Sequence, residues 1–234
     1  SCRRLLAACA VIAPTLTLPT TPAYAVDRDW VGTGPLLFWD TATNWNPNGT
    51  PTDFDNLTLD LDLTGTPIIL GASSRGGVIN FDTFAYELTG AASGTLNTGG
   101  ITRINEGATV TASNGLVWTH FGPEVSTDLY VGGGGFDADD VGDGTLNVTG
   151  ISTINARSVH LGSALDTTGT ATVGDGNNAL LQTTGSDGNY GFFIGDEGTG
   201  TLNVLTGGIA RIANDTSGGI ADFELGIAET GNGT

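Results

Sequence analysis

The residues with the clearest capacity for chemistry are four carboxylates within seven positions. They follow the glycine run Gly132–Gly135 and are Asp137, Asp139, Asp140 and Asp143. Carboxylate oxygens are ligands that Ca²⁺ prefers, and a glycine-rich turn lets several of them face one ion. This segment is therefore a candidate calcium site, and calcium is the one cofactor that the sequence suggests.

The spacing of these carboxylates fits calcium motifs only in part. Residues 132–137 follow the Gly-Gly-x-Gly-x-Asp start of calcium-binding nonapeptide repeats, but Asp139 stands where a large apolar residue is required. No tandem second copy follows. In an EF-hand register, Val141 and Val148 occupy positions where later ligands are needed. Two interpretations stay open, a loosely held calcium ion and an acidic loop in solvent.

Polysaccharide cleavage is the second chemistry that the side chains suggest. Enzymes of that class need clustered carboxylates on one face of the fold. The candidates all lie beside glycines in expected turns, and they are Asp175, Asp187, Asp196 and Glu197. His120 and His160 have no Ser or Cys partner in a recognisable motif. We therefore expect no catalytic residues, with a polysaccharide-cleaving enzyme as the alternative.

A third candidate is a set of side chains that recurs at one place in successive segments. The segments read apolar-x-apolar-Gly, and their glycines are Gly132, Gly162, Gly195 and Gly226. The second residues of these segments are Tyr130, His160, Phe193 and Glu224. If the segments stack in register, these side chains form one outward column. The column could bind a glycan by ring stacking or only stabilise the stack.

Short strands that alternate with these segments carry a second repeated pattern. Gly-Thr-Leu-Asn-Val occurs at Gly144–Val148 and Gly200–Val204, with a related strand at Gly169–Val173 and a near copy at Gly94–Thr98. Alternation predicts that Leu146, Val148, Leu202 and Val204 point inward. The intervening threonines and asparagines then point outward.

Pairs of isoleucines three residues apart follow the Gly-Thr strands. They are Ile101 with Ile104, Ile151 with Ile154, and Ile209 with Ile212. Residues three apart cannot share a face of a straight strand, so each pair predicts a bend. The glycines that end the apolar-x-apolar-Gly segments are 30, 33 and 31 residues apart, with a Gly-Thr strand between each pair, so one repeat has about 31 residues and at least two strands.

The predicted fold class is all-β. The chain is expected to form a solenoid, which is a stack of similar coils. After the leader no long segment has helical periodicity, and the apolar residues fall in short alternating runs. Residues 64–234 are assigned to the repeats, and the chain is expected to be a fragment that stops as another repeat begins. The alternative is a β-sandwich, whose strands recur at 8–12-residue intervals without so long a period.

The first 25 residues have the organisation of a secretion signal peptide. Arg3 and Arg4 give a positive start, Leu5–Leu18 is mostly apolar, and Ala23–Ala25 is a small-x-small cleavage site. The protein is therefore predicted to be secreted or displayed at the cell surface. No later apolar run approaches the roughly 20 residues of a transmembrane helix.

Composition after the leader excludes several classes of partner and site. The leader holds two of the seven basic residues and none of the 25 acidic ones, which leaves five against 25 and a net charge of −20. Such an acidic surface repels phosphate, so nucleic acid is not a predicted partner. Both cysteines, Cys2 and Cys9, lie in the leader, which excludes disulfides and Cys-based zinc sites from the rest.

Residues 26–63 differ from the repeats because they contain three of the four tryptophans. These are Trp30, Trp39 and Trp45. We interpret this segment as an N-terminal cap that covers the open end of the first repeat. A sugar-binding tryptophan cluster is the functional alternative.

The pattern Gly-x-Gly-Thr-Leu-Asn-Val-x-x-Gly-Gly, as in Gly198–Gly208, resembles the autotransporter-type β-strand repeats of exported bacterial surface proteins. The stretch from Trp39 to Asp53 resembles the start of many such chains. This resemblance implies a right-handed parallel β-helix outside the cell, with adhesion or matrix roles and with extracellular glycans or other surface components as partners. We therefore predict a non-enzymatic, adhesin-like surface protein. The alternative is a carbohydrate-binding or carbohydrate-cleaving β-helix.

Overall fold

The computed structural model describes residues 25–32, 37–63, 65–90, 93–122, 127–134, 142–184, 190–213, 221–225 and 232–234. These residues form 22 strands, and their one helical element is a single 3₁₀ turn, η1 (Ala42–Asn44). Among them, no helix has the length and apolar character needed to cross a membrane. The chain is all-β, as predicted.

The strands form three sheets, called A, B and C here. Sheet A holds β1 (Asp27–Trp30), β2 (Trp45–Asn46), β3 (Asn56–Leu59), β6 (Val78–Phe81), β9 (Thr102–Ile104), β12 (Leu129–Val131), β15 (Val159–Leu161), β18 (Tyr190–Ile194) and β21 (Ala221–Leu225). Sheet B holds β4 (Ile68–Leu70), β7 (Ala85–Gly90), β10 (Ala108–Ser113), β13 (Gly144–Val148), β16 (Thr168–Val173), β19 (Thr199–Val204) and β22 (Asn232–Gly233). Sheet C holds β5 (Ser74–Gly76), β8 (Thr95–Thr98), β11 (Val117–His120), β14 (Thr153–Ala156), β17 (Ala179–Thr183) and β20 (Gly208–Ile212).

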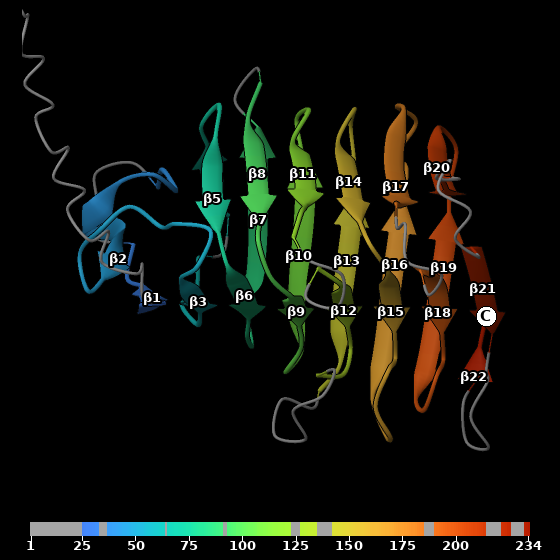
Figure 1. The fold of residues 1–234 in the computed structure, drawn as a ribbon. Coiled ribbons are helices and arrows are strands. Elements are labelled where there is room, and N and C mark those ends of the chain that lie inside the picture. The colour runs from blue at the N-terminus through green and yellow to red at the C-terminus, as the bar shows by residue number, and fades with distance from the viewer. Residues whose placement is uncertain are drawn as a thin grey trace, which may run out of the picture.

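From β3 onward, consecutive strands enter sheets A, B and C in turn. Each strand pairs in parallel with the strand three places later, so neighbours in a sheet come from successive repeats. Figure 1 shows the repeats following one another from the blue to the red end of the chain. Parallel sheets of stacked strands were predicted, whereas the alternative β-sandwich is built from antiparallel sheets.

The repeat reaches its predicted length only in the later part of the chain. In sheet A, Leu57 pairs with Ile79 and Ile79 with Thr102, so the first repeats have about 23 residues each. From β12 onward the pairs are Leu129 with Val159 and Val159 with Phe192, which agrees with a period of about 31 residues. Each repeat also has three strands, one more than the minimum that the sequence indicated. Since the paired strands stay aligned, the extra residues lie in the connections.

Two sequence similarities do not mark equivalent positions. Gly144–Val148 and Gly200–Val204 lie in sheet B, but the near copy at 94–98 supplies β8 of sheet C. Ile104 lies in sheet A, whereas Ile209 and Ile212 share the single strand β20. The isoleucine pairs therefore do not mark one common bend. Strands of all three sheets bury alternate residues, so a short alternating pattern does not identify its sheet.

The apolar core lies between the three sheets. Leu146 and Val148 are fully buried as predicted, and burial stabilises each such side chain by about 1.5–3 kcal/mol. Leu202 packs against the core while partly exposed, and Val204, predicted to point inward, is 49% exposed. The reason is that β22 pairs only with the first two residues of β19, so no described strand covers Val204.

The glycine that ends each apolar-x-apolar-Gly segment lies next to the glycine of the following Gly-Thr strand, at the corner between sheets A and B. Gly162 follows β15 with a φ of +65°, a left-handed conformation that favours glycine. Gly169, in β16, packs against backbone, and a Cβ there would overlap the Val131 carbonyl oxygen and the Gly162 nitrogen. In the same way, a Cβ on Gly144 would overlap the Gly132 nitrogen, and a Cβ on Gly200 would overlap the Gly195 nitrogen. The corner is thus too tight for any side chain.

The three N-terminal tryptophans form one buried cluster at the end of the stack where β1 and β2 lie (Figure 1). The ring of Trp45 meets those of Trp30 and Trp39 edge to face, with centroids 4.9 and 5.0 Å apart. Its indole N–H donates to the Trp39 carbonyl oxygen at 2.8 Å. All three rings are buried, so they offer no face to a sugar. The sugar-binding interpretation of this cluster is wrong, because the rings fill the core instead.

Candidate functional site

The predicted column lies on sheet A, where register aligns its members. Tyr130 in β12 pairs with His160 in β15, and His160 pairs with Phe193 in β18. The ring centroids of Tyr130 and His160 are 4.5 Å apart with an interplanar angle of 13°, and those of His160 and Phe193 are 4.6 Å apart at 9°. The backbone of Glu224 continues the register in β21, and its side chain lies outside the described part.

The rings of this column stack on one another, so they cover each other's faces. Both faces of His160 are covered by the neighbouring rings, and Tyr130 is only 5% exposed. His160 and Phe193 are half-buried. A sugar that approaches from solvent therefore meets ring edges at His160, not a free face. This geometry favours a stabilising role, and glycan binding by the column stays a prediction.

Charged residues beside the column are engaged with one another. The Asp128 carboxylate accepts hydrogen bonds from Arg157 Nη1 at 3.2 and 3.3 Å and lies 3.8 Å from His160 Nε2. Arg103, the register partner of Tyr130 in β9, donates to the Gly134 carbonyl oxygen at 3.1 Å. Burial, reinforced by the Asp128 charge, raises the pKa of Tyr130 to about 12, so its phenol stays protonated at neutral pH.

No sequence motif marks Asp128, Arg157 or Arg103 as members of a site. The only signal was the rarity of basic residues, since five arginines face 25 acidic residues after the leader. A buried arginine in so acidic a chain needs a carboxylate partner. The pairing of Arg157 with Asp128 spans one whole repeat, so the order of residues along the chain does not reveal it.

His120 is buried and is held by hydrogen bonds to two other strands. Its Nδ1 lies 3.1 Å from the Asn155 carbonyl oxygen, so this nitrogen carries the proton and donates. Its Nε2 lies 2.9 Å from the Thr102 hydroxyl and accepts from it, and the ring stacks on Trp118 at 5.3 Å. Burial lowers the pKa of His120 to about 4.

We expect His120 to make the protein less stable as the pH falls. Its folded pKa of about 4 lies below its ordinary value of 6.5, so the unfolded chain takes up the proton first. The contribution is complete above pH 6.5 and is lost between pH 6.5 and 4, which amounts to roughly 2 kcal/mol at pH 5. Urea unfolding at pH 7 and pH 5 measures this loss.

One variant separates His120 from the acidic residues that also titrate. His120→Gln is expected to be less stable at pH 7 but to lose roughly 2 kcal/mol less than the parent between pH 7 and 5. Equal pH dependence in the parent and His120→Gln would show that His120 is not buried in its neutral form.

The calcium prediction is only partly covered by the described residues. Asp143 Oδ1 accepts a hydrogen bond from the Thr168 backbone N–H at 2.6 Å, and the Asp143 carbonyl oxygen accepts one from Gly107 at 2.7 Å. The other three candidates, Asp137, Asp139 and Asp140, lie outside the described residues. Within the described part, no group of three or more His, Cys, Asp or Glu side chains could hold a metal ion. Calcium binding stays a prediction.

Asp175 lies at a different corner from Asp196 and Glu197, in the connection between β16 and β17. Asp175 accepts hydrogen bonds from the backbone N–H groups of Gly150 and Asn177, each at 3.1 Å, and the bond from Gly150 is the main cause that lowers its pKa. Asp187 lies outside the described residues. Asp196 and Glu197 lie between β18 and β19. Asp175 is thus engaged in holding its turn.

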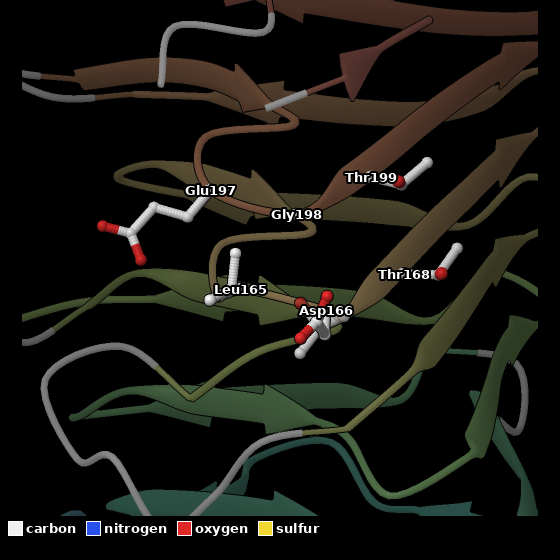
Figure 2. Close-up of a pocket in the computed structure, with 7 residues that line it drawn as sticks. Leu165, Asp166, Thr168, Glu197, Gly198 and Thr199 are labelled. Carbon is white, nitrogen blue, oxygen red and sulfur yellow. The ribbon is translucent and has the colours of Figure 1, made fainter. Parts of the chain in front are cut away.

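A hollow of about 270 Å³ lies beside the turn that contains Glu197 and the corresponding turn of the preceding repeat, which contains Asp166. It is lined by Leu165, Asp166, Thr167, Thr168, Glu197, Gly198 and Thr199. Figure 2 shows the Glu197 carboxylate pointing away from Asp166, with Leu165 between the two turns. The two acidic groups therefore do not face one another across the hollow, as an acid–base pair for glycoside cleavage must.

Comparison with known proteins adds no relative to this picture. No family model matches the chain, and no curated protein or solved structure is significantly similar to it. The function is therefore argued from the stacked sheets and from the side chains on their outer faces.

Proposed function

We propose that this chain is an exported, non-enzymatic surface protein of the autotransporter repeat type. In this proposal residues 64–234 form a right-handed parallel β-helix that presents its outer faces for adhesion. The observation that carries the proposal is the strict rotation of strands through sheets A, B and C, with each strand pairing three places later. A rod of this kind has extended faces, which suit contact with a surface.

Physical reasoning supports the stacked arrangement and its hand. One repeat of three short strands cannot bury its apolar side chains alone, so it needs a neighbour on each side. Connections between parallel strands of one sheet are right-handed in nearly all proteins, which supports a right-handed helix here. The leader in residues 1–25 supports export, and the tryptophan cluster supports an N-terminal cap in residues 26–63.

The outer faces support a non-enzymatic role. Several of their charged side chains bond to one another or to backbone, as Asp128 does with Arg157 and Asp143 does with Thr168. Such groups hold the repeats in register and do not converge on a hollow. We therefore propose adhesion to extracellular glycans or matrix components, without turnover.

An adhesion assay combined with a cleavage assay tests this function. Beads coated with the whole chain are tested for retention on acidic glycans, neutral glycans and matrix proteins, and the same glycans are analysed for cleavage. We expect retention without product, and beads coated with an unrelated acidic protein serve as the control. Reproducible product would favour the polysaccharide-cleaving alternative. Lack of retention on every surface would contradict adhesion.

The second candidate function, carbohydrate binding by the column, has one observation in its favour. The rings of His160 and Phe193 are half-buried and lie in one line along the stack. Edges of aligned rings could guide a glycan chain along sheet A. Removing one ring of the column shows whether glycan binding occurs at the column or at another part of the surface.

Phe193→Ala is expected to reduce stability and leave adhesion unchanged. The substitution removes the stack on His160, which contributes about 0.5–1.5 kcal/mol beyond the loss of buried area. We expect a melting temperature lower by several degrees, measured by circular dichroism, with bead retention as in the parent. Phe121→Ala changes a phenylalanine that is 42% exposed and is the control. Lost retention in a folded Phe193→Ala protein would instead assign glycan binding to the column.

A further inference from the structure

The outer face of sheet B carries a regular, uncharged array of side chains. Four consecutive strands, β10, β13, β16 and β19, each place two alternate residues on this face. In strand order these are Thr109 and Thr111, Thr145 and Asn147, Thr170 and Thr172, and Thr201 and Asn203. We call this set of eight residues the threonine grid. It contains no charged residue in a chain that has 25 acidic ones.

The backbone fixes the spacing of the grid in two directions. The four strands pair residue by residue without a bulge, and Figure 1 shows them side by side and nearly parallel. Neighbouring strands lie about 4.7–4.9 Å apart, and alternate residues of one strand about 6.6–6.8 Å apart. Threonine has two heavy atoms on Cβ, which restrict χ1 and hold its hydroxyl and methyl groups in place. The result is a lattice in which one column consists of four threonine hydroxyl groups and the other alternates threonine hydroxyl groups with asparagine amides.

The outer faces of the other two sheets lack this regularity. At the column positions of sheet A, Arg103, Tyr130 and His160 follow one another. Sheet C places Val117 and Ile209, which are 39% and 50% exposed, on its outer face. Only the grid combines hydroxyl and amide groups over four consecutive described strands without a charge, a ring or an exposed apolar side chain at its eight positions.

We propose that the threonine grid binds ice. A two-dimensional lattice of hydroxyl and amide groups is matched by a partner that also repeats in two dimensions, which flexible chains and globular proteins do not. Hexagonal ice contains rows of oxygen atoms that repeat at a distance close to the strand spacing. Each threonine hydroxyl can both donate to and accept from water, and contacts through ordered water are nearly as favourable as direct ones.

The absence of charges suits an ordered water layer, and the absence of rings favours ice over crystalline polysaccharide. Charged side chains hold strong hydration shells of their own, and the grid has none to disturb an ordered water layer. Crystalline polysaccharide also repeats in two dimensions, but its sugar rings pack on aromatic faces, and the grid has no aromatic residue. Ice is therefore the partner that this chemistry fits.

Ice growth in the presence of the whole chain tests the proposal. Inhibition of ice recrystallisation and shaping of single ice crystals are compared among the parent, Thr145→Lys/Thr170→Lys and Thr153→Lys. Thr153 is half-buried on the outer face of sheet C, so it controls for a lysine placed on a strand away from the grid. We expect activity in the parent and in Thr153→Lys, and activity at background level in the double variant, with all three equally folded by circular dichroism.

The other outcomes overturn the proposal. No effect of the parent on ice would do so, as would activity kept in the folded double variant or lost equally in Thr153→Lys. Retention on microcrystalline cellulose or chitin without an effect on ice would assign the grid to polysaccharide instead. If the double variant does not fold, Thr172→Lys alone gives the same test, since Thr172 is half-buried in the middle of the grid.

Discussion

Gly169→Ala is expected to destabilise the protein by at least about 3 kcal/mol, the upper end of the usual cost of overpacking. A Cβ at this position overlaps the carbonyl oxygen of Val131 in the preceding repeat and the nitrogen of Gly162 in its own. Both obstacles are backbone atoms, so no side-chain rotation relieves the overlap. The corner between sheets A and B must open, which disturbs the pairing of β16 with β13 and β19.

A glycine with open space around it provides the control for this substitution. Gly107 has a φ of +88°, and a Cβ there would meet no atom within 4 Å, so Gly107→Ala tests backbone conformation alone. Alanine in a left-handed conformation costs about 1–2 kcal/mol. Urea unfolding of the parent and both variants gives the comparison. If Gly169→Ala costs no more than Gly107→Ala, the corner is looser than the structure indicates.

Alternating apolar residues and recurring glycines account for the part of the fold that the sequence predicts. Alternation of apolar residues identified all-β structure and several strands, because each strand buries every second residue. The recurrence of Gly132, Gly162 and Gly195 predicted stacked repeats, since the corner admits no side chain there. The third strand of each repeat was missed, because β14, β17 and β20 share no motif. For the same reason the pattern did not show that the near copy at Gly94–Thr98 belongs to sheet C, not to sheet B.

In the candidate site, too, the sequence predicted the positions of residues along the strands but not the contacts between strands. The alignment of Tyr130, His160 and Phe193 followed from their fixed distance to the corner glycines. Their surroundings did not follow, because Asp128 and Arg157 meet only when strands of successive repeats are paired. The burial of His120 was equally hidden, since its two hydrogen-bond partners belong to other strands. Sequence predicts what lies on a strand more readily than what lies across from it.

The threonine grid shows a different limit of the sequence patterns. Four of its residues, Thr145, Asn147, Thr201 and Asn203, were predicted to point outward, but as parts of separate short motifs. Thr109 and Thr111 belong to a strand without the Gly-Thr-Leu-Asn-Val pattern, and only the pairing of β10 with β13 adds them to the array. A surface property can therefore be a property of register, which single motifs do not contain.

Trp45→Ala is expected to cost about 3–5 kcal/mol, the range for removing a buried tryptophan or phenylalanine side chain. The ring of Trp45 is fully buried against Trp30 and Trp39, and its N–H satisfies the Trp39 carbonyl oxygen. The variant leaves a cavity and an unpaired buried carbonyl group, and the latter alone costs about 1–3 kcal/mol. Urea unfolding followed by circular dichroism measures the loss without relying on tryptophan fluorescence.

Two further variants identify the cause of that loss. Trp45→Phe keeps an aromatic ring in the cluster and is expected to cost less, because it mainly removes the indole hydrogen bond. Phe54→Ala changes an aromatic residue of the same segment that is 62% exposed, and it is expected to have little effect. Since β1 and β2 cover β3 at this end of sheet A, Trp45→Ala is also expected to aggregate through the exposed strand edge. A Trp45→Ala protein that is monomeric and as stable as Phe54→Ala would contradict the cap in residues 26–63, because the stack would then not depend on it.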